Sequence, residues 1–400
     1  MSRPHKIGLN IFKAVASVVM VALLAIFATG VSPVYDFTDP RPFSGSAIYN
    51  PYRNLDTLNG WKRSNFHVHT RVDGIFNECD KWPGEVYDDL RRFGYDIVTF
   101  SNHNCLTAHP FDTALQVNVY EHGYNLFKYH KLVFGSQKVN RFDHLLPVFT
   151  FQKQFQLDLL SKDSDFIQMN HPLRTEGTSK KHMERLEGYQ IMELDSGKST
   201  ENEYWDWALS AGKYSHALAN DDLHDPDRSS KIAVRCSFLN CQSASYEDIC
   251  NTLMNGCYYS MRVPDYGNGD WDIKYAKNMD LPSIEDIGME DETIYMLLSE
   301  AADSIKVTGQ GHTTLAIARD TCGISYTMKD SDPYARMTAY FPEGEVIYTN
   351  VFARYDPAVA DSPFAYPSHK VNILLTILYN LMLVLLCIGT IMAAKKLFRL

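Results

Sequence analysis

The stretch Phe66-His-Val-His-Thr70 decides which fold and which site we predict, because it ends a short apolar strand with two histidines. Three later segments place a histidine or an aspartate directly after a predicted strand: Ser101-Asn-His-Asn104, Asn170-His-Pro172 and Asp221-Asp-Leu-His224. Side chains at successive strand ends can converge on one point, and imidazole with carboxylate suits zinc, manganese or iron. The sequence therefore predicts a multinuclear metal site and a metal-dependent hydrolase.

Strands and helices alternate along the first two thirds of the chain. Residues 64–68 predict a strand, residues 83–93 a helix that ends at Gly94, and residues 95–100 an almost wholly apolar second strand. That succession continues downstream and is typical of parallel strands that are buried on both faces. We expect an α/β barrel over residues 61–265.

The rest of the chain outside the apolar ends has a different texture. Residues 290–356 contain alternating β-type runs separated by turns, which predict a small antiparallel β-domain. Residues 35–60 are rich in Pro, Asn and Gly without periodicity, which predicts a linker between the membrane and the barrel.

Two apolar segments predict membrane helices, at residues 7–31 and 371–394. Each has about 20 uncharged residues, which is enough to cross ~30 Å of hydrocarbon as a helix. The first segment could instead be a cleaved signal peptide, in which case the second would still anchor the protein. Basic residues flank both outer ends, so we expect cytoplasmic termini and an extracytoplasmic domain, periplasmic or at the cell surface.

The composition limits the partners of the protein. The 400 residues are 45% hydrophobic and 22% charged, enough for one large core with a smaller accessory domain. A formal net charge of −10 without a basic run excludes a dedicated nucleic-acid surface. The 8 cysteines form neither a CxxC metal pattern nor a disulfide framework, which leaves free thiols or one or two disulfides as alternatives.

In residues and in order, these segments resemble the PHP (polymerase and histidinol phosphatase) superfamily. The resemblance covers about residues 60–265, and the run 334–352 is similar to the small β-domain of the CehA/McbA-like branch. It implies a distorted (β/α)7 barrel with a small C-terminal antiparallel β-domain. It also implies two or three divalent metal ions at the C-terminal mouth of the strands.

When the motifs of the superfamily are matched to this sequence position by position, the resemblance implies eight metal-binding residues. Glu121 matches by position and neighbourhood only, and His122 beside it is an alternative donor. His130 stands where related sequences often carry a histidine, in a structural role more often than as a ligand. The implied ligands are His67, His69, Asp73, His103, Glu121, His171, Asp222 and His224.

Arg174, three residues after His171, is the candidate catalytic residue, as a clamp for phosphate or carboxylate. The alternatives for this role are Arg71, Lys198 and Arg228.

Three positions depart from the pattern of the superfamily. The loop to Asp73 is one residue shorter than usual, Asn102 replaces an aspartate, and Ser136 falls where some members place a ligand. These departures favour two metal ions over three.

The predicted reaction is hydrolysis of a phosphomonoester or phosphodiester by water that metal ions activate. The expected substrate is a small-molecule or envelope-linked ester. The protein itself is expected to be an integral membrane protein with two membrane helices. The resemblance leaves open a non-phosphate ester or carbamate on the same metals. An alternative of another class is a non-catalytic metal-binding or scaffold domain on a membrane anchor.

Overall fold

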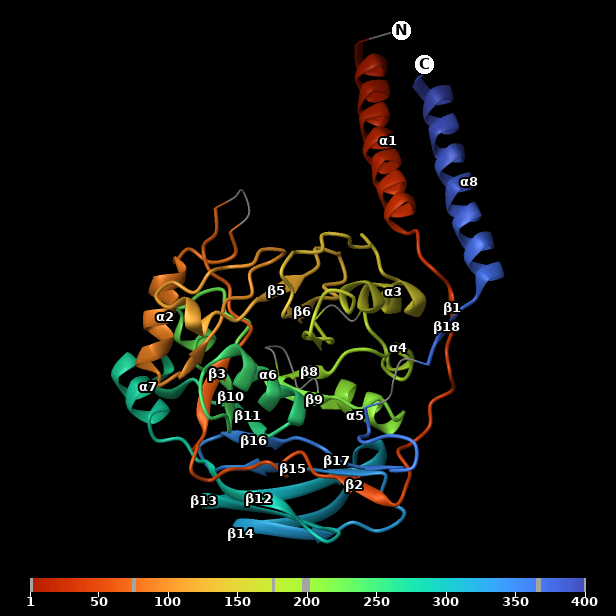
Figure 1. Cartoon of the computed structure of the whole chain (residues 1–400). Helices are drawn as coiled ribbons and strands as arrows, with labels where there is room; N and C mark the ends of the chain where they lie inside the picture. Colours follow the sequence, from red (N-terminus) through yellow and green to blue (C-terminus); the bar gives the residue numbers. More distant parts are fainter. Residues whose placement is uncertain (1–2, 74–76, 175–176, 196–201, 365–367, 399–400) are drawn as a thin grey trace.

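A computed structural model describes residues 3–73, 77–174, 177–195, 202–364 and 368–398. A mixed α/β body carries two long helices that stand side by side away from it, and both chain termini lie at their far ends (Figure 1). The helices of the described residues are α1 (Arg3–Thr29), α2 (Pro83–Arg92), α3 (Thr150–Leu160), α4 (Lys180–Met183), α5 (Asn202–Ser210), α6 (Tyr246–Asn255), α7 (Trp271–Asn278) and α8 (Ile373–Phe398).

Within the described ranges the strands form three sheets, of 2, 11 and 5 strands. The smallest pairs β1 (Tyr35–Asp36) with β18 (Lys370–Val371). The 5-stranded sheet has the order β5 (Val119–His122), β6 (Lys131–Phe134), β7 (Phe166–Met169), β8 (Ile191–Leu194) and β9 (His216–Ala219). The 11-stranded sheet contains β2 (Ala47–Tyr49), β3 (Lys62–Asn65), β4 (Ile97–Val98), β10 (Arg235–Leu239), β11 (Tyr258–Arg262), β12 (Ile284–Glu290), β13 (Thr293–Gly309), β14 (Thr313–Thr327), β15 (Tyr334–Tyr340), β16 (Val346–Thr349) and β17 (Phe352–Tyr355).

Strands β3 to β9 are connected to one another, but they do not form a regular (β/α)7 barrel. β3 pairs with β4, and β7, β8 and β9 pair in turn, all parallel, whereas β6 is antiparallel to both β5 and β7. Isolated parallel bridges, His103 with Glu121 and Val68 with Leu223, link the ends of β4 to β5 and of β9 to β3. Only residues 123–130 separate β5 from β6, too few for the crossover that a parallel pair requires. The distorted (β/α)7 barrel therefore remains a prediction.

The C-terminal strands continue the sheet that begins in the predicted barrel. β12, β13, β15 and β16 pair antiparallel in the order β12-β13-β15-β16, and β16 pairs with β11, where Tyr259 lies opposite Thr349. The two predicted domains thus share backbone hydrogen bonds, and the boundaries proposed for them remain predictions.

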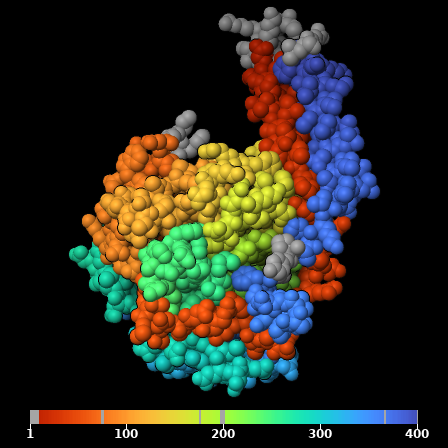
Figure 2. Space-filling view, in the orientation of Figure 1, coloured from red at the N-terminus to blue at the C-terminus, as the bar shows by residue number. Residues whose placement is uncertain are grey.

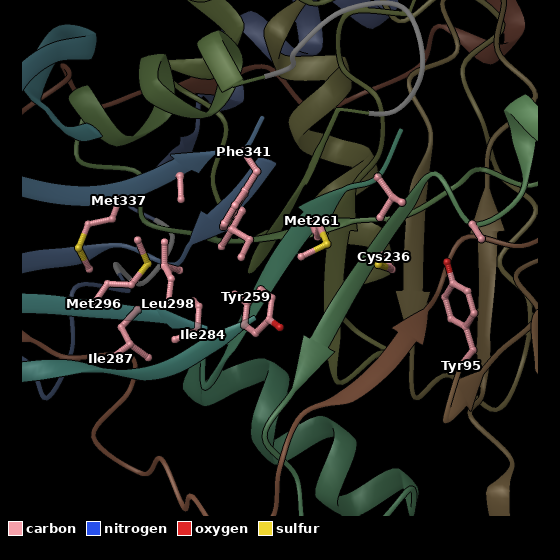
Figure 3. Packing of buried hydrophobic residues seen from close by; sticks show 14 of the residues in the cluster. Tyr95, Cys236, Tyr259, Met261, Ile284, Ile287, Met296, Leu298, Met337 and Phe341 are labelled. Atoms are coloured by element: carbon pink, nitrogen blue, oxygen red, sulfur yellow. The ribbon is translucent and has the colours of Figure 1, made fainter. Parts of the chain in front are cut away.

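A continuous apolar core joins β11 to the strands of the C-terminal part (Figure 3). Ile294, Met296 and Leu298 are buried at every second position of β13, as the period of a strand requires. They share this core with Tyr259 and Met337. Each large apolar side chain buried in this way contributes roughly 1.5–3 kcal/mol. All eight cysteines lie within the described residues and are free thiols.

Helices α1 and α8 are both long and apolar enough to cross a membrane, over Asn10–Thr29 and Ile373–Phe398. Their apolar side chains are exposed, not packed in the core. Asn380 of α8 fixes this helix to the segment that follows α1 by bonding both backbone groups of Ser32. Its Oδ1 accepts from Ser32 N at 3.2 Å, and its Nδ2 donates to Ser32 O at 2.9 Å.

The segment that we predicted to be a linker is ordered on the body of the protein. β1 pairs with β18, β2 pairs with β17, and Tyr49 and Tyr52 are buried. Next to β18, His369 lies 3.0 Å from Asp158 Oδ2 and 3.1 Å from Glu187 Oε2. Burial lowers the pKa of His369, but hydrogen bonds to Asp158 and Glu187 raise it to about 9 overall.

Candidate metal centre

Seven strand ends deliver polar side chains to one buried place. Backbone hydrogen bonds hold two of these ends together, since His69 N donates to Leu223 O at 2.8 Å and Leu223 N donates to His67 O at 3.1 Å. The second isolated bridge joins His103 to Glu121. The delivered side chains are His67 and His69 after β3, His103 after β4, Glu121 in β5, His130 before β6, His171 after β7, Glu193 in β8 and Asp222 after β9.

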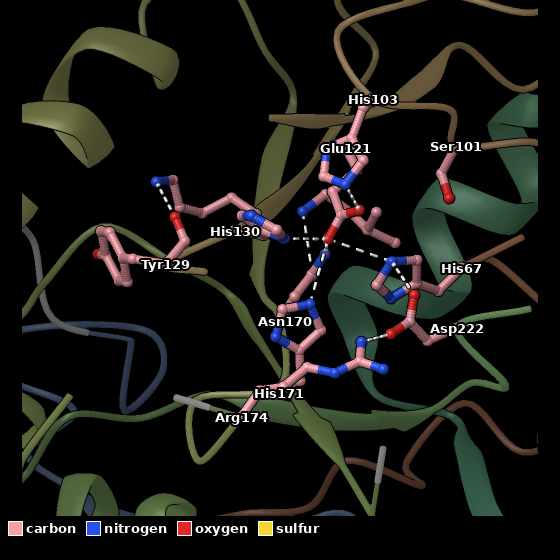
Figure 4. A network of polar contacts seen from close by, with 12 residues as sticks. His67, Ser101, His103, Glu121, Tyr129, His130, Asn170, His171, Arg174 and Asp222 are labelled. Carbon is pink, nitrogen blue, oxygen red and sulfur yellow. Dashed lines mark hydrogen bonds and ion pairs between the residues drawn. The ribbon is translucent and has the colours of Figure 1, made fainter. Parts of the chain in front are cut away.

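Four of these side chains form the centre of the group. His67, His69, Glu121 and Asp222 are all buried, and one possible ligand atom of each lies within 4.8 Å of the others. His67 Nε2 lies 3.2 Å from Glu121 Oε1 and 3.1 Å from Asp222 Oδ1. His69 Nε2 lies 3.3 Å from both Glu121 Oε2 and Asp222 Oδ1. Figure 4 shows the convergence of several of these side chains on Glu121.

Two further groups with metal-binding chemistry adjoin this centre. His103, Glu121 and His130 form one, with His103 Nε2 2.9 Å from Glu121 Oε2 and His130 Nδ1 3.1 Å from Glu121 Oε1. His69, Glu78 and His103 form the other. Because Glu121 belongs to two of the three groups, one carboxylate could serve two neighbouring ions.

The buried atoms that face one another make no ordinary hydrogen bonds. His67 Nε2, His69 Nε2 and Asp222 Oδ1 are all without a hydrogen-bond partner. A buried polar atom left in this state costs about 1–3 kcal/mol, so the arrangement calls for a further interaction. Two imidazoles with two carboxylates are a suitable donor set for zinc, manganese or iron. The described residues therefore form a buried His/Glu/Asp cluster that is compatible with a divalent metal site.

Backbone geometry also distinguishes this site. His171 and Asp222 adopt positive φ angles of 23° and 50°, a region that residues with a side chain seldom occupy. Such strain costs on the order of 1–3 kcal/mol per residue and is found most often where a function requires it. The turns after β7 and β9 therefore keep an unfavourable backbone conformation, and this conformation directs the side chains of His171 and Asp222 toward the cluster.

Glu193 orients the ring of His67 through the ring nitrogen that does not face the cluster. Its Oε1 lies 2.8 Å from His67 Nδ1, its Oε2 accepts from His171 N at 3.0 Å, and both His67 and Glu193 are fully buried. A carboxylate only accepts, so His67 Nδ1 carries the proton and Nε2 is left to face the cluster. Burial lowers the pKa of His67, but Glu121 and Glu193 raise it to about 10. The surrounding charge therefore favours a cation at the centre.

Arg174 closes the exposed edge of the cluster. Its Nη1 forms an ion pair with Asp222 Oδ2, and its side chain is 28% exposed. It brings a guanidinium, the group best suited to bind a phosphate in a bidentate manner, next to the candidate ligands (Figure 4). Lys198, one of the alternatives for this role, lies outside the described residues.

Of the eight predicted ligands, the structure brings seven to the cluster or its edge. His171 Nε2 lies 3.3 Å from Glu121 Oε1. His224 is at the edge, with its ring centroid 4.2 Å from that of His69 and its Nδ1 bonded to the carbonyl of Asp222. Asp73 is exposed and belongs to none of the metal-binding groups among the described residues. Glu78, which follows Asp73 in the sequence, lies beside His69 and His103 instead. Whether these residues bind metal remains a prediction.

Other predicted alternatives have structural partners. The ring of His122 is turned away from the cluster, with its Nε2 2.8 Å from Phe142 O. Asn102 fixes the turn after the two histidines: its Oδ1 accepts from Thr70 N at 2.8 Å and its Nδ2 donates to Thr70 Oγ1 at 2.8 Å. An amide does both, whereas an aspartate at this position could not donate.

Glu78 and Glu193 are site residues that the sequence analysis missed. Glu78 Oε2 lies 3.2 Å from His69 Nδ1 and 3.3 Å from His103 Nε2. Its signal was weak, an acidic residue shortly after the paired histidines. Glu193 had a stronger signal, because a lone carboxylate in an otherwise apolar buried strand is rarely left without a charged partner.

A large cavity of the structure lies away from the cluster. It has a volume of about 840 Å³, and its lining includes Arg53, Glu187 and Lys213 but none of the clustered side chains. The candidate site is therefore identified by its chemistry and burial, not by its size.

One solved structure is similar to the chain. It is a two-domain protein from Bacteroides vulgatus ATCC 8482 that contains a predicted PHP-like metal-dependent phosphoesterase. The two share 13% identity with a TM-score of 0.38, over 79% of this chain and 99% of the other. No family model and no curated protein matches the chain.

Proposed function

We propose that this protein is a metal-dependent hydrolase of the PHP type that cleaves a phosphomonoester or a phosphodiester. The observation that carries the proposal is the buried group of His67, His69, Glu121 and Asp222, in which His67 Nε2, His69 Nε2 and Asp222 Oδ1 have no hydrogen-bond partner. The PHP-type barrel over residues 61–265 and the CehA/McbA-like β-domain over residues 290–356 belong to the same proposal. The connection of β3 to β9 supports it.

The roles of the residues follow from their placement. His67, His69, Glu121 and Asp222 would hold one divalent ion, and Glu121 would share a second with His103 and either His130 or His171. Such ions, zinc, manganese or iron, supply an activated water molecule and neutralise phosphate charge. Hydrolysis adds the oxygen of water to phosphorus, breaks one phosphorus–oxygen ester bond and leaves the proton on the alcohol.

Arg174 would bind the substrate phosphate. It is the cation that directly contacts the cluster at its exposed edge, through Asp222. There its guanidinium would bind the phosphate oxygens of a substrate next to the candidate ligands.

We further propose that α1 and α8 both cross the membrane, with cytoplasmic termini and an extracytoplasmic domain. Two observations support this arrangement: the helices stand side by side on one end of the body, and both termini lie at the same far end. Basic residues at the chain ends favour the cytoplasmic side for them.

Metal content and hydrolysis test the proposal together. The full chain purified in detergent should hold about two equivalents of metal by elemental mass spectrometry. It should also hydrolyse phosphomonoesters or phosphodiesters in preference to carboxylic esters and carbamates. The double variant His67→Ala/His69→Ala should lose both properties, whereas His216→Ala, which removes another buried histidine outside the cluster, should keep them. A wild-type protein without bound metal would overturn the proposal, and metal binding without hydrolysis would favour a scaffold.

A further inference from the structure

Exposed apolar side chains gather on two neighbouring loops close to the base of the long helices. Tyr124 and Leu126 are 60% and 65% exposed, and Leu126 N donates to Leu145 O of the second loop at 3.1 Å. Single exposed apolar residues are common, but a group on adjoining loops marks a contact surface. We name this surface the apolar rim; its members are Tyr124, Leu126, Phe142, Val148 and Phe149.

The loops that carry the apolar rim contact the ends of both apolar helices. Leu145 N donates at 3.1 Å to Oγ1 of Thr29, the last residue of α1. Tyr379 of α8 lies against Phe151, with ring centroids 4.9 Å apart, and Phe151 stacks on Phe149 at 5.1 Å. The yellow segment that carries the rim reaches the base of α1 (Figure 2). If the helices cross a membrane as proposed, the rim lies where the bilayer surface begins.

The same rim borders the candidate metal centre. Tyr124 OH donates to His103 O at 3.2 Å, and the two rings lie 5.2 Å apart. Among the clustered side chains, Glu78, His224 and Arg174 are 38%, 36% and 28% exposed, and so mark where the cluster opens. His103 contacts both Glu78 and Tyr124. The opening of the site and the apolar rim are therefore adjacent.

Positive charge accompanies the apolar rim. Lys128 and Arg141 are exposed, one on each of the two loops. Cations beside aromatic and aliphatic side chains are typical of protein surfaces that contact anionic lipid headgroups. The surface therefore has the chemistry of a bilayer contact more than that of a protein interface, whose core is depleted of lysine.

We infer that the substrate is a phosphoester carried by a membrane lipid, which reaches the metal centre across the apolar rim while its acyl chains stay in the bilayer. The inference rests on the proposed function and deepens it by naming the substrate class. Hydrolysis leaves one product in the bilayer and releases the other into water, with the oxygen of water on phosphorus and the proton on the departing alcohol.

The first test compares the same headgroup in the bilayer and in solution. The full chain, reconstituted in phosphatidylcholine vesicles, is given long-chain phosphatidic acid and phosphatidylglycerol, or their short-chain water-soluble forms. We expect faster cleavage of the long-chain form. Leu126→Asp should lower the ratio of the long-chain to the short-chain rate about tenfold, because a leucine loses its burial in lipid. Leu58→Asp is the matched control, since this exposed leucine precedes β3 and so lies at the strand end opposite His67.

A second test requires no hydrolysis. Tryptophan is introduced by Leu126→Trp or, as a control, by Leu58→Trp, and its fluorescence is measured in vesicles that contain brominated lipid. Contact with the bilayer predicts additional quenching for Leu126→Trp alone.

The outcomes separate the inference from the proposed function. Extra quenching together with long-chain preference supports the inference. Equal quenching in the two variants overturns it. Hydrolysis of para-nitrophenyl phosphate or of the short-chain forms, without the long-chain preference, also overturns it and leaves the proposed function intact. No hydrolysis of any ester by the metal-loaded chain overturns the proposed function, and the substrate class with it.

Discussion

Replacement of Glu193 by glutamine should weaken metal binding without unfolding the protein. The carboxylate of Glu193 makes its two shortest contacts with the N–H donors His67 Nδ1, at 2.8 Å, and His171 N, at 3.0 Å. Glutamine has the same shape but only one accepting oxygen, so one of these two bonds must be lost. In a fully buried place the lost bond to a charged group is worth about 1.5–3 kcal/mol. At about 1.4 kcal/mol per factor of ten, metal affinity should fall roughly 10- to 100-fold, the range usual for such supporting carboxylates.

Competition with a chromogenic chelator measures this affinity, and circular dichroism shows whether the variant is folded. Glu187→Gln is the matched control, because Glu187 is another buried glutamate in a hydrogen-bonded network but lies outside the cluster. It should bind metal with unchanged affinity. A folded Glu193→Gln protein with wild-type affinity would refute the argument that Glu193 orients His67.

The remaining predictions concern stability. Metal at about 100 times its dissociation constant should stabilise the fold by about 2.7 kcal/mol, so a chelator should lower the Tm, and an unchanged Tm would contradict a buried site. Gly256→Ala should destabilise more than Gly60→Ala in urea unfolding. Both glycines have positive φ, but a Cβ at Gly256 would meet the ring of His216 at 2.3 Å, whereas Gly60 faces open space. The raised pKa of His369 means that its stabilising effect is complete below pH 6.5 and is lost as the pH rises through about 9. Between pH 7 and 10 the wild-type Tm should therefore fall more than the Tm of His369→Gln. An equal fall in Tm for the two proteins would contradict this prediction.

The positions of the strand ends could be predicted from the sequence, because they depend on local apolar runs followed by polar turns. His67, His69, His103, His171 and Asp222 all stand at such positions. Their convergence requires only that the neighbouring strand ends meet on one side of the sheet.

The choice between two acidic residues in one loop could not be made in this way. Asp73 and Glu78 both follow the paired histidines, and only the path of the folded loop leaves the first exposed and brings the second to His69 and His103. Glu193 likewise had no motif around it, because its function depends on a contact with His67, which is far away in the sequence.

The sequence by itself predicted several of the strands and helices, the two apolar helices and most of the polar side chains at the cluster. Each of these depends on residue type and on spacing over a few positions. Only the tertiary structure decided that β6 is antiparallel to β5, that β16 continues the sheet through β11, and that the loops of the apolar rim contact both Thr29 and His103. These features depend on which distant segments pack together, and packing energy is shared among many weak contacts that no short stretch of sequence contains.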